Sequence, residues 1–380
     1  MLKNLRYPIN DNESIVYPNN SNCSINLVNS ILKHYTNKHF HSTLEIMDEV
    51  LTKEYKHIFL IILDGLGNKV IENNLADNSF MLSKRIAKIS AVYPCTTVAA
   101  TTALQAGKFP IENGWLGWHQ YFKSLDKDIT LFTNTEYYSG KTYTELNVAN
   151  DVIPYTEIID IIARSGVKTS SIFPSFKEGG AENFDEVISR IKVIAEEKDN
   201  SFTYVYWNEP DKTMHDDGCY GESTKQVIQT LDQQLKNLSE EILSDTLLII
   251  TPDHGMIDVD EIDLNDHPEL LACLKRNPSI EPRCSNFYVK DECHEEFVSI
   301  FEREFKDFVL FDKASLIASK IFGEGLAHPV LSDIVGDYVA MAYGNRMFIH
   351  ETAYSHNFKA HHAGLTENEM SIPLIVATKK

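Results

Sequence analysis

The stretch HIFLIILDGLG (residues 57–67) joins a long apolar run to an aspartate and a glycine, and it decides the fold class. Three further apolar runs, residues 89–93, 203–207 and 246–251, are each followed by a turn that begins at or next to a proline or asparagine. Between the runs, residues 184–197 and 222–243 repeat apolar residues with a helical period. This alternation of strands and helices predicts an α/β fold, with a mostly parallel sheet sandwiched by helices.

The remaining segments predict how the chain is divided. Residues 24–35 have a helical pattern, and residues 338–342 and 374–377 have strand patterns. The pattern changes between residues 266 and 345, where short segments (285–289, 295–304 and 312–321) replace the longer runs. We interpret 266–345 as a smaller inserted α+β cap and residues 1–265 and 346–380 as the core.

Polar side chains follow the predicted strands at the points where they end. Asp64 follows the first run, Asp211 the run at 203–207, and Asp253 the run at 246–251. In parallel sheets, ligands gather at the carboxyl ends of the strands. We therefore expect these carboxylates to meet at one edge of the sheet.

Each polar motif also has an interpretation that needs no chemistry. Asp64 is a favoured type of helix cap, and one of the adjacent Thr96 and Thr97 would cap the helix expected from residue 98. Asp211 and His215 are four residues apart, which is also the spacing of an ordinary surface pair on a helix. His361 and His362 would equally suit an exposed loop.

Taken together, the motifs supply three carboxylates, three imidazoles and one hydroxyl. That set suffices to hold two divalent cations and to aim an oxygen nucleophile between them. The seven residues are Asp64, Thr97, Asp211, His215, Asp253, His254 and His362.

In their order along the chain, the segments IILDGLG, YPCTTVAATT, NEPDKTMH, TPDHGM and HHAGL resemble the alkaline phosphatase superfamily. Within it, they resemble most the type I phosphodiesterase/nucleotide pyrophosphatase branch. The resemblance covers roughly residues 55–125, 201–258 and 360–377. It implies an alkaline-phosphatase-like core.

The resemblance also implies roles for the seven residues. Thr97, the second threonine of its run, would be the nucleophile. One cation would be held by Asp64, Asp253, His254 and the Thr97 oxygen. The other would be held by Asp211, His215 and His362.

Two positions depart from the family pattern. Trp118 stands where animal-type relatives carry an asparagine that helps to hold the phosphoryl oxygen. The late motif reads His362-Ala363-Gly364 in place of His-Gly. We interpret Trp115 and Trp118 as packing residues, with stacking on a substrate as the alternative.

These residues predict a metal-dependent phosphodiesterase or nucleotide pyrophosphatase that works through a phosphothreonine at Thr97. Zinc is the expected metal, and manganese is the alternative because the site is rich in carboxylates. The rival functions are a phosphomonoesterase, a phosphomutase and a metal-stabilised binding protein without turnover. A sulfatase is disfavoured, because Thr97 is followed by Val98 and Ala99 and not by the Pro and Arg of that pattern.

Composition narrows the partners. A formal net charge of -20 over 380 residues argues against stable nucleic-acid binding. The resemblance implies a small phosphate ester or nucleotide as substrate. No apolar stretch approaches the length of a membrane span, and a cytoplasmic location is the default expectation. The six cysteines show no CxxC pairing and predict free thiols. The sequence predicts no oligomeric state.

Overall fold

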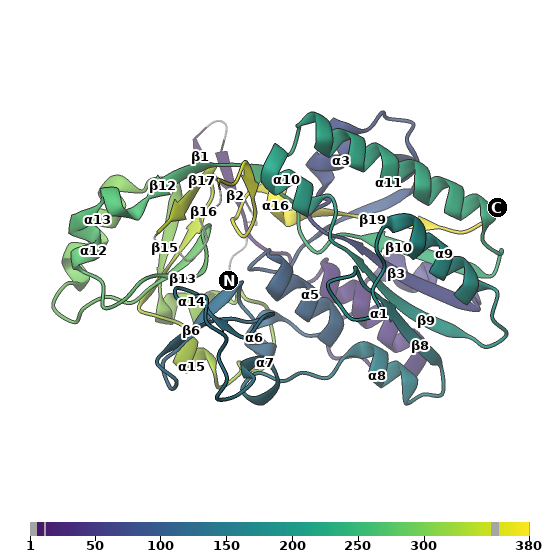
Figure 1. Ribbon diagram of the computed structural model, residues 1–380, viewed down its shortest axis with the longest axis horizontal. Coiled ribbons are helices and arrows are strands. Elements are labelled where there is room, and N and C mark those ends of the chain that lie inside the picture. Colours follow the sequence, from purple (N-terminus) through teal and green to yellow (C-terminus); the bar gives the residue numbers. More distant parts are fainter. Residues whose placement is uncertain (1–5, 11–12, 351–356, 380) are drawn as a thin grey trace.

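Two large sheets organise the chain in this computed structural model, which describes residues 6–10, 13–350 and 357–379 (Figure 1). The six-stranded sheet has the order β4 (Arg85–Ser90), β19 (Ser371–Ala377), β10 (Thr246–Thr251), β3 (His57–Leu63), β9 (Ser201–Trp207) and β8 (Lys168–Ile172). The pairings among β10, β3, β9 and β8 are parallel, and β19 is antiparallel to both of its neighbours. The predicted mostly parallel sheet is confirmed.

Helices cover both faces of this sheet (Figure 1), and its central strand β3 is therefore buried on both sides. Alternate residues of β3, beginning with Ile58, pack into one apolar core, and those beginning with Phe59 pack into another. The first core includes α1 (Ser24–Thr36), α5 (Thr97–Ala106) and α8 (Ile158–Ala163). The second includes α3 (Asn68–Asn74), α9 (Phe184–Ala195) and α11 (Glu222–Glu241). A strand buried on both faces must be apolar throughout, which accounts for the run HIFLIIL.

The seven-stranded sheet lies beside the first and is antiparallel throughout (Figure 1). Its order is β15 (Phe308–Asp312), β16 (Tyr338–Ala342), β14 (Cys284–Phe287), β13 (Ser279–Glu281), β5 (His119–Phe122), β6 (Lys127–Thr130) and β7 (Thr135–Glu136). Four of these strands come from the predicted insert, 266–345, and three come from residues 119–136. The division into core and cap stays a prediction, and this second sheet draws on both parts.

Helices α12 (Pro268–Ala272) and α13 (His294–Glu304) pack against the second sheet through an aromatic core that includes Phe287 and Phe297. Three two-stranded ladders join outlying segments: β1 (Arg6–Asn10) with β2 (Glu13–Val16), β11 (Ile257–Asp258) with β18 (Ala360–His361), and β12 (Asp260–Asp263) with β17 (Arg346–Ile349).

Short helices fill the connections, and they are α2 (Glu45–Val50), α4 (Phe80–Lys84), α6 (Pro110–Asn113), α7 (Val148–Asp151), α10 (Asp211–Asp217), α14 (Lys313–Ser319), α15 (Leu331–Ile334) and α16 (Glu367–Met370). Within the described residues, no helix combines the length and apolar character that crossing a membrane requires.

One predicted strand is misplaced. Residues 89–93 were expected to form it, but β4 covers Arg85–Ser90 and the chain leaves the sheet before Tyr93. The reason is its partner: β19 begins at Ser371, which pairs with Ser90, so the ladder ends there. Strands β3, β10 and β16 have the predicted bounds.

Candidate active site

Strand register brings the three predicted carboxylates to one edge of the six-stranded sheet. Leu63 of β3 pairs with Trp207 of β9, and Ile62 pairs with Thr251 of β10. The turns that follow β3 and β10 carry Asp64 and Asp253, and Asp211 begins α10, with three residues between it and the end of β9. The backbone N–H of Asp211 donates to the carbonyl of Asp64 at 3.1 Å, which fixes the two turns against each other.

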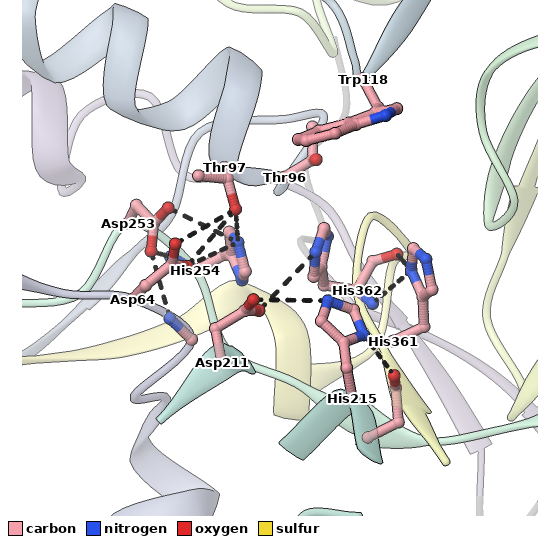
Figure 2. Close-up of polar contacts among 12 residues, drawn as sticks. Asp64, Thr96, Thr97, Trp118, Asp211, His215, Asp253, His254, His361 and His362 are labelled. Atoms are coloured by element: carbon pink, nitrogen blue, oxygen red, sulfur yellow. Dashed lines mark hydrogen bonds and ion pairs between the residues drawn. The ribbon is translucent and has the colours of Figure 1, made fainter. Parts of the chain in front are cut away.

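Asp64, Asp253 and His254 form the first of two adjacent groups of metal-type donors, whose donor atoms all lie within 4.8 Å of one another. His254 Nε2 lies 3.4 Å from Asp64 Oδ1 and 3.5 Å from Asp253 Oδ2. Thr97 Oγ1 lies 3.2 Å from the same nitrogen and 3.4 Å from each Asp64 oxygen. Figure 2 shows all four side chains converging on one point.

Asp211, His254 and His362 form the second group, so His254 stands between the two. His362 Nε2 lies 3.8 Å from Asp211 Oδ1, and His215 Nε2 lies 3.3 Å from Asp211 Oδ2. The ladder of β11 with β18 brings the late histidines here, because it joins the segment after His254 to the segment before His362. The structure thus brings all seven predicted residues together, and their roles as ligands and nucleophile stay predictions.

Backbone contacts orient the imidazoles. His254 Nδ1 lies 2.9 Å from the Gly255 carbonyl, and His215 Nδ1 lies 2.8 Å from the Ala360 carbonyl. A ring nitrogen that donates to a carbonyl leaves the other nitrogen free as a ligand, and here that is Nε2 on the side of the carboxylates. His361 Nδ1 contacts the backbone of His362, 2.9 Å from its N–H and 3.1 Å from its carbonyl, and among the described residues His362, but not His361, belongs to a group of metal-type donors. This geometry favours His362 as the ligand.

The donor set fits divalent cations. Buried Asp211 Oδ1, Asp253 Oδ2 and His362 Nδ1 have no hydrogen-bond partner. Among the described residues, only histidines form ion pairs with Asp64, Asp211 and Asp253. Buried polar atoms are almost always paired, so unpartnered ones require an explanation such as an ion.

Local electrostatics agree with a cation site. Burial raises the pKa of Asp64 well above its usual range, and the nearby carboxylates of Asp253 and Asp211 raise it further. Burial also lowers the pKa of His362 well below its usual range, and His254 lowers it further. Like charges held together in a dry site repel one another, and a divalent cation would relieve that repulsion while binding the neutral imidazole.

Thr96 and Thr97 occupy different positions at the start of α5. Thr97 is the first residue of the helix, and its hydroxyl faces the carboxylates (Figure 2). Thr96 precedes the helix, and its hydroxyl donates to Oε1 of Glu281 at 2.6 Å. Of the two hydroxyls, only that of Thr97 lies among the metal-type donors, beside helix N–H groups of the kind that bind phosphate.

Two residues of the site carry no sequence signal. The Tyr206 hydroxyl, from within β9, donates to Asp64 Oδ2. Glu281, from the second sheet, contacts Thr96. Both are single side chains whose partners lie more than 140 positions away in sequence, and no local pattern marks them.

The two tryptophans have opposite environments. Trp115 is 4% exposed and its indole N–H donates to the Ile153 carbonyl at 2.9 Å, so it is a packing residue as predicted. Trp118 is 42% exposed, and Figure 2 shows its ring on the same side of the cluster as Thr96 and Thr97. The interpretation of Trp118 as a packing residue is therefore wrong: it directly precedes β5, an inner strand of the second sheet, and its partly exposed ring lies near Thr96 and Thr97.

Comparison with known proteins shows which family and which solved structures this chain resembles. The model of the type I phosphodiesterase / nucleotide pyrophosphatase family matches residues 58–305. Murine ectonucleotide pyrophosphatase / phosphodiesterase 5 has a similar structure, with a TM-score of 0.64 and 17% identity over 86% of this chain and 88% of that one. An inactive threonine-to-alanine variant of the murine protein, in complex with AMP, matches at 16% identity with the same coverage and TM-score.

Phosphonoacetate hydrolase from Sinorhizobium meliloti, in complex with phosphonoformate, matches with a TM-score of 0.60 and 13% identity over 86% of this chain and 91% of that one. A comparison of the sequence with curated proteins gave no match. The structural matches confirm the predicted alkaline-phosphatase-like fold.

Proposed function

Because the chain belongs to the type I phosphodiesterase/nucleotide pyrophosphatase family of the alkaline phosphatase superfamily, we propose that it hydrolyses phosphoric diesters or anhydrides, with Thr97 as nucleophile beside two divalent cations. The substrate would be a small phosphate ester or nucleotide. We propose zinc as the metal, with manganese as the alternative.

One observation carries the proposal. Thr97 Oγ1 lies within 3.4 Å of the Asp64 carboxylate and 3.2 Å of His254 Nε2, at the first residue of α5. A structural metal site needs no spare hydroxyl, whereas a phosphoryl transfer enzyme needs one held beside its positive charges.

The residues divide the chemistry between them. Asp64, Asp253, His254 and Thr97 would hold one cation, and Asp211, His215 and His362 the other. The bound cations would stabilise the deprotonated hydroxyl of the threonine and the charge on the phosphoryl oxygens.

Thr97 Oγ1 attacks phosphorus, its proton passes to water, and the bond from phosphorus to the leaving oxygen breaks. The N–H groups at the start of α5 face the phosphoryl oxygens during this step. With a diester, the phosphoryl group on Thr97 keeps the second ester group; water then attacks phosphorus, the bond to Thr97 Oγ1 breaks, and the phosphate monoester is released with the hydroxyl restored.

The test compares hydrolysis of bis-nitrophenyl phosphate with that of the nitrophenyl monoester, nitrophenyl sulfate and phosphonoacetate, by protein loaded with zinc or manganese. We expect the diester to be turned over fastest. Thr97→Ala should keep its cations and lose about a thousandfold or more in kcat. An acid-quenched reaction with the diester should show one nitrophenyl-phosphoryl group on the wild-type Thr97 peptide.

Thr102→Ala is the matched control, because Thr102 is a buried threonine on the same helix outside the cluster. It should keep wild-type kcat. Faster turnover of the monoester would instead favour a phosphomonoesterase or phosphomutase. Full activity of Thr97→Ala, or loaded protein that turns over no substrate, would contradict the proposal.

A further inference from the structure

The carboxylate of Glu281 connects the second sheet to the start of the nucleophile helix. Glu281 ends β13 and is 4% exposed. Its Oε1 accepts a hydrogen bond of 2.6 Å from the Thr96 hydroxyl and one of 2.7 Å from the backbone N–H of Trp118. One buried oxygen thus joins three segments that are far apart in sequence.

Trp118 is held by its backbone on both sides. Its N–H donates to Glu281, and its carbonyl accepts from the Leu131 N–H at 3.2 Å. Its ring meets Phe132 edge-on, with centroids 6.1 Å apart, and Phe132 is itself 50% exposed. Figure 2 shows the Trp118 ring near Thr96 and Thr97, and its contact with Phe132 makes the two partly exposed rings an aromatic wall on an anchored backbone.

A shift in the position of Thr96 would also move Thr97, because the two residues are adjacent. The backbone of Thr96 is extended, and Thr97 is the first residue of α5. The Thr96 side chain accepts no capping bond from the helix, and its hydroxyl donates to Glu281. The position of Thr97 therefore depends on a contact with the second sheet as well as on the helix.

Burying a carboxylate such as that of Glu281 lowers the stability of the fold unless hydrogen bonds satisfy it, and a buried apolar side chain would carry a smaller free-energy cost. Two short bonds to a charged acceptor hold their donors in a narrow geometry. Displacing a reacting group by about 1 Å can slow catalysis by about a hundredfold.

We infer that Glu281 is a positioning residue, which fixes Thr96, and through it Thr97, relative to an aromatic wall led by Trp118 that contacts the substrate. The kinetic part of this inference rests on the proposed role of Thr97. The geometric part does not.

The test uses Glu281→Ala and Glu281→Gln in the full chain loaded with cations. The glutamine carbonyl can still accept both bonds, so Glu281→Gln should keep kcat within about threefold, whereas Glu281→Ala should lose about a hundredfold in kcat with unchanged cation content. Thr96→Val removes one donor only, and its effect should not add to that of Glu281→Ala, because both break the same contact.

Acrylamide quenching of tryptophan fluorescence gives a readout without activity. Trp115 and Trp207 are buried, so Trp118 supplies most of the quenchable emission, which Trp118→Phe would identify. Quenching should change in Glu281→Ala and stay near wild type in Glu281→Gln.

Asn286→Ala is the matched control. Asn286 is buried in the neighbouring strand β14 and donates to Ser279 Oγ at 3.0 Å and to the Ile334 carbonyl at 2.9 Å, away from Thr96. It should lose stability and keep both kcat and quenching.

Equal kinetic loss in Asn286→Ala and Glu281→Ala, or wild-type kcat and quenching in Glu281→Ala, would overturn the inference. If wild-type protein hydrolysed no ester, the proposed function would fail, while the quenching comparison would still decide whether Glu281 holds Trp118. Should Glu281→Ala not fold, Thr96→Val and Glu281→Gln carry the same comparison.

Discussion

Replacing Glu369 by glutamine tests the buried ion pair that supports the His362 loop. Arg283 and Glu369 are both fully buried and meet in two parallel bonds, Nε to Oε1 at 2.7 Å and Nη2 to Oε2 at 2.8 Å. The same carboxylate accepts from the Gly364 N–H at 2.7 Å and from the Thr366 hydroxyl at 2.6 Å. The pair therefore ties the second sheet to a loop that begins two residues after His362.

The expected loss in the free energy of unfolding follows from the unpaired charge that Glu369→Gln leaves in the core. Glu369→Gln preserves the volume but leaves the Arg283 guanidinium buried without its counter-charge, and it turns an amide N–H towards one of the donors. Removing one partner of a buried pair costs about 3–5 kcal/mol. We expect the free energy of unfolding to fall by that amount.

Urea unfolding at fixed cation concentration measures the loss, because bound ions add to apparent stability. Arg283→Met combined with Glu369→Gln should recover part of it, since the double variant leaves no unpaired charge. Glu269→Gln is the control: its carboxylate is 74% exposed and lies 3.4 Å from Arg303, so its loss should cost less than about 1 kcal/mol. A cost for Glu369→Gln as small as that of the control would refute the reasoning.

Three further predictions concern the cations. Asp211→Ala should lose one of two cation equivalents by elemental analysis, because Asp211 contacts His215 and His362, and retention of both would remove it from the ligand set. Chelation should lower the Tm and added zinc should restore it, since three buried carboxylates would repel one another without a cation; an unchanged Tm would argue against the site. Tyr206→Phe removes the hydrogen bond to Asp64 and should weaken cation affinity about 10–100-fold in a competition titration, and wild-type affinity would show that Tyr206 does not orient that ligand.

The fold of the core was predictable because its signal is local. Strands β3 and β10 are buried on both faces, so their sequences are uninterrupted apolar runs, and the helices between the strands repeat with their own period. Strand β8 (KTSSI) escaped prediction, because it lies at the edge of the sheet and buries little beyond Ile172.

The second sheet could not be assembled from sequence for a different reason. Ile280 of β13 pairs with His119 of β5, 161 positions earlier. Neither strand has an apolar run that would identify it as a strand from the sequence. Local patterns describe how a segment folds and say nothing about which distant segment it pairs with.

The same distinction explains which parts of the site were predictable. The three carboxylates and His254 follow strands of one sheet that run parallel, and topology alone brings such ends together, whereas His362 arrives through the separate ladder of β11 with β18. Tyr206 and Glu281 reach the site as single side chains from within their strands, and only coordinates show where those side chains lead.

The residues proposed to break the ester bond and those proposed to contact the rest of the substrate come from different parts of the fold. Most of the metal-type donors and Thr97 lie in the segments that follow strands of the six-stranded sheet, and His362 follows β18. Glu281 ends β13 of the second sheet, and Trp118 directly precedes β5 of that sheet. The second sheet contacts the residue before α5 through the Glu281–Thr96 hydrogen bond, so a change in β13 would reach Thr97 through Thr96, whereas the aspartates and histidines of the two donor groups come from other segments. Trp118, which the sequence predicts to stand in place of an asparagine of animal-type relatives, lies on the side of the second sheet. It is therefore expected to change which esters enter the site more than how their bonds are broken.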